Sequence, residues 1–229
     1  MKRVCILAII PARSNSKGLI GKNMKLFKGK PLVQWTIEAA KKSKLIDNIF
    51  ISTDSSKLIK LIRKLKLEVP ELRPKFLSQD ATPMYKVVLH ALSLKKNFSH
   101  FVLLQPTSPL RTALDIDNLI KQAINNGESS VVSISEVKDH PRYMFSIKKN
   151  RKIKKYFDSK KIYNREKFEK IFRENGAIYF ESIKEFKKNK SFINSKTKGF
   201  IMPYNKSIDI DTIYDFKIAE MFLKKKIDK

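Results

Sequence analysis

Short apolar runs alternate with longer amphipathic stretches through the first half of the chain. Strands are expected at residues 4–10, 48–53, 101–105 and 130–135, and helices at residues 32–44, 56–66, 84–96 and 113–126. In the last of these helices apolar residues recur at helical spacing, as at Ile116, Leu119 and Ala123. Thr112 and Asp115 are spaced for a capping box at its start. Strands that alternate with helices predict an α/β fold, with a mostly parallel sheet, right-handed crossovers and helices on both faces.

A different pattern begins at about residue 138 and lasts until about residue 175. Residues 143–148 and 152–157 alternate around a Lys-Asn-Arg turn, which predicts a two-stranded ribbon. The first pattern then returns, with strands expected at residues 177–180 and 200–203 and helices at residues 182–189 and 212–226. No repeat or low-complexity linker interrupts the sequence. We therefore expect one domain over residues 1–229, with an inserted excursion at about 138–175.

Polar loops follow three of the expected strands, and a parallel sheet would bring these loops to one edge, where ligands bind. They are residues 11–23, 53–54 and 105–108. The first loop is rich in Gly, Ser and Asn and carries the cations Arg13, Lys17 and Lys22. Backbone N–H groups and cations gathered at one point suit the phosphates of a nucleoside triphosphate. We therefore expect a triphosphate site at this edge, and the alternative is a basic loop that is merely solvated.

This first loop does not have the spacing of the ATPase P-loop. Two residues separate Gly18 from Gly21, where a P-loop has four residues between its first Gly and its Gly-Lys pair. Asn23 stands where the P-loop has Ser or Thr after its Lys. The sequence therefore excludes a P-loop and leaves another kind of triphosphate loop.

Asp209 and Asp211 are the most informative acids in this basic chain. They alternate with Ile208 and Ile210, so an extended segment turns both carboxylates to one side, with Cα atoms about 6–7 Å apart. Mg²⁺ that bridges triphosphate oxygens needs one or two carboxylates and keeps several waters. The pattern favours a Mg²⁺ site, with Mn²⁺ as an alternative ion. The competing interpretation is that residues 211–212 cap the last helix.

Several short motifs occur in a fixed order along the chain. Ala-Arg-x-x-Ser-Lys-Gly-x-x-x-Lys-Asn at 12–23 precedes Ile-Ser-Thr-Asp at 51–54, Leu-Gln-Pro-Thr-Ser-Pro-Leu-Arg at 104–111, Asn-Gly-Ala-Ile-Tyr at 175–179 and Ser-Ile-Asp-Ile-Asp-Thr at 207–212. In this order, over nearly the whole chain, they resemble the acylneuraminate cytidylyltransferase family, the CMP–sialic acid synthetases. The resemblance implies a Rossmann-like nucleotidyltransferase sheet. It also implies that CTP reacts with a nine-carbon 2-keto sugar acid, N-acylneuraminate, to give the CMP-sugar and pyrophosphate.

The resemblance also implies roles for individual residues. The catalytic residues would be Arg13, Lys22 and Asp211, and the metal ligands would be Asp209 and Asp211. The nucleotide would contact Ala12, Arg13, Ser16, Lys17, Asn23 and Arg73, of which Arg73 lies near the cytosine. The sugar acid would contact Gln105, Thr107, Ser108, Arg165, Tyr179 and Phe192. Judged by pattern alone, Tyr179 and Phe192 are more often core positions, and Arg73 and Arg165 are as often surface arginines.

Three stretches depart from the family pattern. Pro83 and Met84 replace small hydroxylated residues near the expected base site, and Ile193 replaces a second aromatic residue near the sugar. Glu-Lys-Phe at 166–168 replaces a polar run beside Arg165. Because the last two lie where sialic-type sugars differ, legionaminate or pseudaminate is the alternative substrate. The resemblance also implies a homodimer, in which the excursion reaches the partner subunit.

The charge of the chain is unusual, with 49 Lys and Arg against 22 Asp and Glu and a net charge of +27. Of these cations 40 are Lys, and they are scattered, whereas nucleic-acid-binding proteins concentrate Arg and aromatic residues on one element. We expect no specific nucleic-acid partner, and a basic RNA-binding protein without turnover is the remote alternative. The single cysteine, Cys5, fits a reducing, cytoplasmic location. No run approaches the roughly 20 apolar residues of a membrane helix, so no membrane partner is expected.

Overall fold

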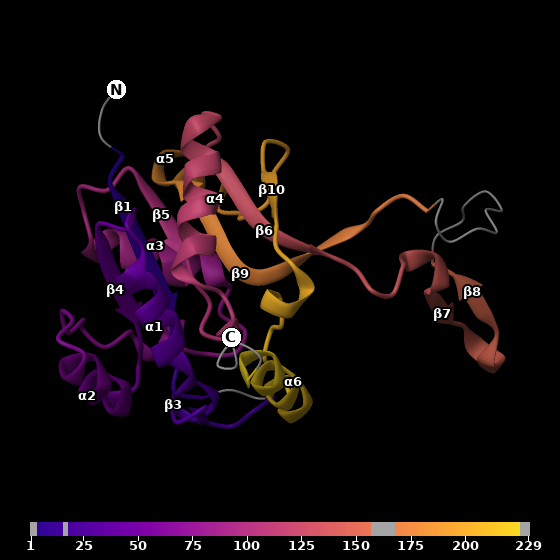
Figure 1. Ribbon diagram of the computed structural model, residues 1–229, viewed down its shortest axis with the longest axis horizontal. Helices are drawn as coiled ribbons and strands as arrows, with labels where there is room; N and C mark the ends of the chain where they lie inside the picture. Colours follow the sequence, from indigo (N-terminus) through magenta and orange to yellow (C-terminus); the bar gives the residue numbers. More distant parts are fainter. Residues whose placement is uncertain (1–3, 16–17, 157–167, 225–229) are drawn as a thin grey trace.

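A six-stranded sheet forms the centre of the protein (Figure 1). The computed structural model describes residues 4–15, 18–156 and 168–224. The sheet has the strand order β10-β6-β9-β5-β1-β4. The strands are β1 Ile6–Pro11, β4 Asn48–Ser52, β5 His100–Leu103, β6 Ser130–Glu136, β9 Phe172–Ser182 and β10 Lys198–Ile201. Because β9 alone runs antiparallel to its neighbours, this sheet is mostly parallel, and the prediction is confirmed.

Helices cover both faces of the sheet, as predicted (Figure 1). They are α1 Leu32–Lys42, α2 Ser56–Lys64, α3 Met84–Leu94, α4 Ala113–Asn125, α5 Ile183–Asn189 and α6 Ile213–Lys224. In β1, Ile6, Ala8 and Ile10 pack with α1, α2 and α4, whereas Leu7 and Ile9 pack with α3 and α5. Burial on both faces explains why this strand is apolar throughout. None of the helices in the described ranges is long and apolar enough to span a membrane.

The first four helices begin where the sequence predicts and end one or two residues earlier, whereas α5 and α6 each begin one residue later than predicted. At the start of α4, Thr112 and Asp115 form the predicted capping box, in which the Asp115 carboxylate accepts a hydrogen bond from Thr112 N at 2.8 Å. α1 ends at Lys42 because Ser43 is already extended, with φ −65° and ψ 138°. Apolar spacing fixes the buried face of a helix, but backbone angles such as these fix its last turn.

The inserted excursion leaves the sheet between β6 and β9. These two strands pair as far as Glu136 and Phe172, and Val137 N donates to Ile171 O at 3.0 Å. Beyond this point β7 (Phe145–Ile147) and β8 (Ile153–Lys155) form the predicted antiparallel ribbon. Figure 1 shows the ribbon standing well away from the rest of the protein.

A third group of buried apolar residues lies under α6, apart from the two clusters on the sheet faces. It includes Phe27, from the short hairpin of β2 (Leu26–Phe27) and β3 (Lys30–Pro31), and Phe216 from α6, whose ring centroids lie 5.1 Å apart. Ile208 and Ile210 are buried in the same group. The residues that alternate with these isoleucines therefore face away from this core.

Candidate active site

A cavity of about 470 Å³ opens at the carboxyl edge of the sheet. Its walls come from the loop after β1, the segment that leads into α3, the turn after β5 and the segment before α6. The predicted site residues that line it are Arg13, Lys22, Asn23, Arg73, Gln105, Thr107, Asp209 and Asp211. The structure thus brings residues predicted for nucleotide, sugar and metal to one place.

The backbone of the loop after β1 is anchored on both sides of Arg13. Ala12 N donates to Ser52 O at 2.8 Å, and Arg13 O accepts from Asn23 Nδ2 at 2.9 Å. Ser14 N donates to the Asp54 carboxylate at 2.7 Å. Ala12 is fully buried and its amide is already bonded, so this amide cannot also bind the base. Ser16 and Lys17 lie outside the described residues.

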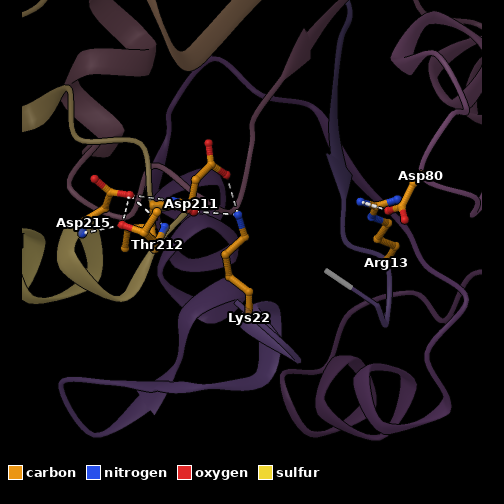
Figure 2. Close-up of polar contacts among 7 residues, drawn as sticks. Arg13, Lys22, Asp80, Asp211, Thr212 and Asp215 are labelled. Carbon is orange, nitrogen blue, oxygen red and sulfur yellow. Dashed lines mark hydrogen bonds and ion pairs between the residues drawn. The ribbon is translucent and has the colours of Figure 1, made fainter. Parts of the chain in front are cut away.

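Lys22 is held inside the cavity wall rather than in solvent. It is 8% exposed, and its Nζ donates to Ile210 O at 2.6 Å and to Asp211 Oδ1 at 2.9 Å (Figure 2). A lysine this buried needs a charged partner, and Asp211 supplies it. The predicted catalytic cation and the predicted metal ligand are therefore one ion pair.

The same loop meets the Asp211 segment again at Gly18. A Cβ atom on Gly18 would lie 2.4 Å from Asp211 O, a distance that real Cβ contacts do not reach. The glycine is needed here for close backbone approach rather than for a turn. It fixes the distance between the cation loop and the carboxylate segment.

Arg13 faces the cavity from the loop after β1, and Arg73 faces it from the opposite wall, in the segment that leads into α3. Arg13 Nη2 lies 2.6 Å from Asp80 Oδ1 (Figure 2). Arg73 is 5% exposed, and its Nε donates to Ser78 Oγ at 3.1 Å. Arg73 Nη2 is buried and makes no hydrogen bond within the described part of the chain. An unsatisfied buried donor costs about 1–3 kcal/mol, so this wall is suited to a ligand with an acceptor.

Asp209 and Asp211 both face the cavity, as their alternation with buried isoleucines predicts. Burial raises the pKa of Asp209, and the neighbouring Asp211 carboxylate adds to this. Asp209 Oδ1 is buried and has no hydrogen-bond partner among the described residues. A Cβ atom on Gly176 would lie 3.2 Å from Asp209 Oδ2. The backbone of β9 therefore approaches this carboxylate closely at Gly176.

These two carboxylates fit a hard divalent cation. The oxygen of Asp209 without a partner is the kind of ligand that Mg²⁺ binds, and one or two carboxylates suffice when phosphates and water complete its coordination. The described residues contain no group of three or more acids, histidines or cysteines that would hold a metal without such help. The donor set therefore suits an ion that arrives with a triphosphate.

The helix-cap interpretation of residues 211–212 is confirmed for Thr212, whereas the Asp211 carboxylate takes no part in the cap of α6. Asp215 N donates to Thr212 Oγ1 at 3.2 Å, and the Asp215 carboxylate accepts from Thr212 N at 2.8 Å (Figure 2). Burial alone would raise the pKa of Asp215, but the hydrogen bonds that its carboxylate accepts from the Thr212 hydroxyl, Thr212 N and Asp211 N lower it below its ordinary value. The Asp211 side chain is left to face the cavity.

The residues predicted for the sugar acid divide into three sets. Gln105 and Thr107 line the cavity, whereas Ser108 is fully buried beside it. Tyr179 is 6% exposed, donates to Glu174 Oε2 at 3.0 Å and packs 5.3 Å from the ring of Phe192. These two rings belong to the core cluster under α5 rather than to the cavity lining. Arg165 lies outside the described residues.

A buried polar network behind Asp209 escaped prediction from the sequence. Asn175 Nδ2 donates to Ser207 Oγ at 2.9 Å, and Ser133 Oγ donates to Asn175 Oδ1 at 2.6 Å. This network ties β6 and β9 to the segment that carries Asp209, two residues after Ser207. The Asn-Gly dipeptide at 175–176 was the available signal, since it marks a special backbone conformation, and Gly176 has φ +72°.

Comparison with known proteins agrees with this site. Residues 7–227 match the family described as cytidylyltransferase. The chain belongs to the cytidylyltransferase family. It is 35% identical to the N-acylneuraminate cytidylyltransferase of Streptococcus agalactiae serotype V over 218 residues, which are 94% of this chain and 52% of that protein. The chain therefore spans about half the length of the streptococcal relatives that it matches.

A shorter relative matches over nearly its whole length. The CMP-N,N'-diacetyllegionaminic acid synthase of Legionella pneumophila is 35% identical over 96% of each chain. Among solved structures, a CMP:2-keto-3-deoxy-manno-octonic acid synthetase complexed with CTP superposes with a TM-score of 0.73 at 14% identity, covering 97% of this chain and 99% of that one. The 4-diphosphocytidyl-2C-methyl-D-erythritol synthase of Anaerococcus prevotii gives a TM-score of 0.67 at 16% identity over 96% of each chain. At these identities the structural likeness establishes the fold.

Proposed function

We propose that this protein transfers the cytidylyl group of CTP to the anomeric hydroxyl of a sialic-type sugar acid and releases pyrophosphate. The observation that carries the proposal is the convergence of Arg13, Lys22, Asp209 and Asp211 on one cavity. Cations suit the phosphates, and carboxylates suit the divalent ion that accompanies them. Both occur here in a chain whose family is cytidylyltransferase.

In the proposed reaction the anomeric oxygen forms a bond to the α-phosphorus while the bond from that phosphorus to pyrophosphate breaks. The hydroxyl proton passes to solvent water, and negative charge grows on the equatorial and leaving oxygens. The Arg13 guanidinium and the Lys22 ammonium are fixed charges that stabilise this state more than the ground state. Asp209 and Asp211 would hold Mg²⁺, or Mn²⁺ in its place, which when bound neutralises and orients the triphosphate.

Arg73 supports a pyrimidine base on the opposite wall. Its buried Nη2 makes no hydrogen bond within the described residues, and cytosine offers acceptors at O2 and N3. Thr82 and Met84 line the same part of the cavity, although Met84 departs from the small residue of the family pattern. We propose that Arg73 donates to the base and so fixes the end of the nucleotide remote from the reaction.

The proposed sugar is N-acylneuraminate, with legionaminate or pseudaminate as the alternative. Gln105 and Thr107 would meet it, because they line the cavity beside Asp209. The relatives are named for all three sugars, including a pseudaminic acid cytidylyltransferase of Campylobacter jejuni that is 29% identical over 98% of this chain. A cytoplasmic location agrees with the unpaired thiol of Cys5.

We further propose a homodimer formed through the ribbon. The pairing of β7 with β8 places Phe145, Ile147 and Ile153 on one ribbon face, and they are 47%, 78% and 64% exposed. A two-stranded ribbon is at best marginally stable by itself, so a second copy that covers this face would stabilise it. Ile147→Ser with Ile153→Ser should convert a dimer to a monomer in analytical ultracentrifugation, whereas Lys154→Ser on the other face should not. A wild-type monomer would contradict the proposal.

The test of function is pyrophosphate release from CTP and Mg²⁺, with N-acetylneuraminate, legionaminate, pseudaminate and Kdo offered in parallel. We expect release with one or more of the nine-carbon sugars and none when ATP or GTP replaces CTP. Asp209→Asn should raise the Mg²⁺ concentration needed for half-maximal rate, while Glu68→Gln, an exposed acid remote from the cavity, should not. If the folded protein releases no pyrophosphate with any of these sugars, the proposal is refuted.

A further inference from the structure

We propose that Asp80 is a positioning residue that holds the Arg13 guanidinium over the cavity, an inference that rests on the proposed function. The pair joins two walls that come from distant parts of the sequence. Arg13 follows β1, whereas Asp80 lies in the turn before α3, and the two charged groups meet at 2.6 Å (Figure 2). Asp80, which lies on the wall that would bind the base, thereby holds the arginine that would stabilise the reacting phosphorus.

The loop fixes the backbone of Arg13 but not its side chain. Three successive residues are anchored by hydrogen bonds of 2.7–2.9 Å. Ala12 N and Ser14 N each donate one, and Arg13 O accepts one. The guanidinium lies several bonds beyond these anchors, and within the described part of the chain it forms an ion pair with Asp80. The position of the charge therefore depends on Asp80.

Asp80 can act as an anchor because its own turn is held to the sheet. Arg73 N donates to Thr53 O at 2.7 Å, and Arg73 Nε donates to Ser78 Oγ at 3.1 Å. Within the turn Thr82 N donates to Gln79 O at 3.1 Å. Asp80 thus extends from a turn that is braced on both sides.

The ion pair contributes too little to stability to be explained as a fold contact. Its side chains are 31% and 39% exposed, and ion pairs this exposed add little to the free energy of unfolding. An arginine side chain, however, loses much rotamer entropy when it is held in one position. Fixing it before the triphosphate binds removes that cost from the transition state, where orientation matters most.

The charge of Asp80 gives the inference a distinctive signature. A carboxylate that lines a triphosphate cavity repels the ligand, so its removal should leave CTP binding unchanged or tighter. Its removal should also release Arg13 and so slow the chemical step. Turnover should therefore fall while CTP binding stays the same or tightens, which loss of a merely structural contact would not produce.

The decisive variant is Asp80→Asn, which keeps the shape and removes the charge. The first readout is ¹⁵N relaxation of the arginine Nε–Hε groups, with the Arg13 signal assigned by its loss in Arg13→Lys. In the wild type Arg13 should be rigid, and in Asp80→Asn it should become as mobile as Arg63, which is exposed on α2. Glu68→Gln breaks a comparable surface ion pair with Lys95, remote from the cavity, and should leave Arg13 unchanged.

The second readout is steady-state kinetics. Asp80→Asn should lower kcat about 10–100-fold with an unchanged or lower KM for CTP, and Asp80→Glu should recover part of the loss. The inference would be overturned if the Arg13 side chain stayed rigid in Asp80→Asn, or if it were already mobile in the wild type. So would an unchanged or higher kcat in Asp80→Asn. If the wild type releases no pyrophosphate while relaxation shows the expected change, the proposed function fails but the positioning of Arg13 by Asp80 stands.

Discussion

Gly18→Ala should slow cytidylyl transfer strongly while leaving the fold intact. The added methyl group would lie 2.4 Å from Asp211 O, and neither atom is at the end of a flexible side chain. Restoring an ordinary contact requires the loop and the Asp211 segment to separate by about 1 Å. Misplacement of catalytic groups by about 1 Å can cost about 100-fold in rate, or about 2.7 kcal/mol in the barrier.

The assay is kcat for pyrophosphate release, measured beside the melting temperature. Gly199→Ala is the matched control, because its methyl group would also make a close contact, at 2.6 Å, but with the flexible end of Ile134. Gly199 lies in β10, on an edge of the sheet, and this variant should keep the wild-type rate. A Gly18→Ala rate within about threefold of wild type, with the protein folded, would show that the close approach at Asp211 does not set the geometry of catalysis.

Three further predictions concern charge. Burial raises the pKa of Glu181 from an ordinary 4.5 to about 8, so the free energy of unfolding should fall by up to about 5 kcal/mol as pH rises from 4.5 to 8. Chemical denaturation at several pH values should show this slope in the wild type and not in Glu181→Gln, and a flat wild-type profile would contradict it. Lys22→Met should lower kcat by about 100–1000-fold, because it removes a fixed charge and leaves Asp211 without its partner, whereas Lys57→Met on α2 should not. The net charge of +27 should attract CTP, and added salt should screen this attraction. We therefore expect kcat/KM for CTP to fall with added salt more steeply than kcat. A rate constant for CTP binding that is independent of salt in stopped-flow measurements would exclude electrostatic steering.

Much of the fold follows from local sequence patterns. Alternation of apolar runs with amphipathic stretches predicts the strands and helices of the first half, and Thr112 with Asp115 marks the start of α4. The direction of β9 could not be predicted in this way. A buried apolar run such as residues 177–180 reads the same in a parallel and an antiparallel pair, and only long-range pairing with β5 and β6 fixes its direction.

The candidate site likewise contains residues that short motifs predict and contacts that only the fold creates. The cations of the first loop and the alternating aspartates were visible in the sequence because their chemistry lies in short motifs. The Asp80–Arg13 pair and the burial of Lys22 were not, since each depends on segments brought together by the sheet. In the structure the rings of Tyr179 and Phe192 pack in the core cluster under α5, and their contact with the sugar stays a prediction.

The central claim is that this cavity joins a sugar oxygen to the α-phosphorus of CTP. It is tested most directly by ³¹P NMR of the product formed from CTP and a nonulosonic acid labelled with ¹⁸O at the anomeric hydroxyl. The account predicts a CMP-sugar whose phosphorus signal carries the isotope shift of a bridging ¹⁸O, together with free pyrophosphate. A product without that shift, or unchanged CTP with every sugar acid offered, would contradict it.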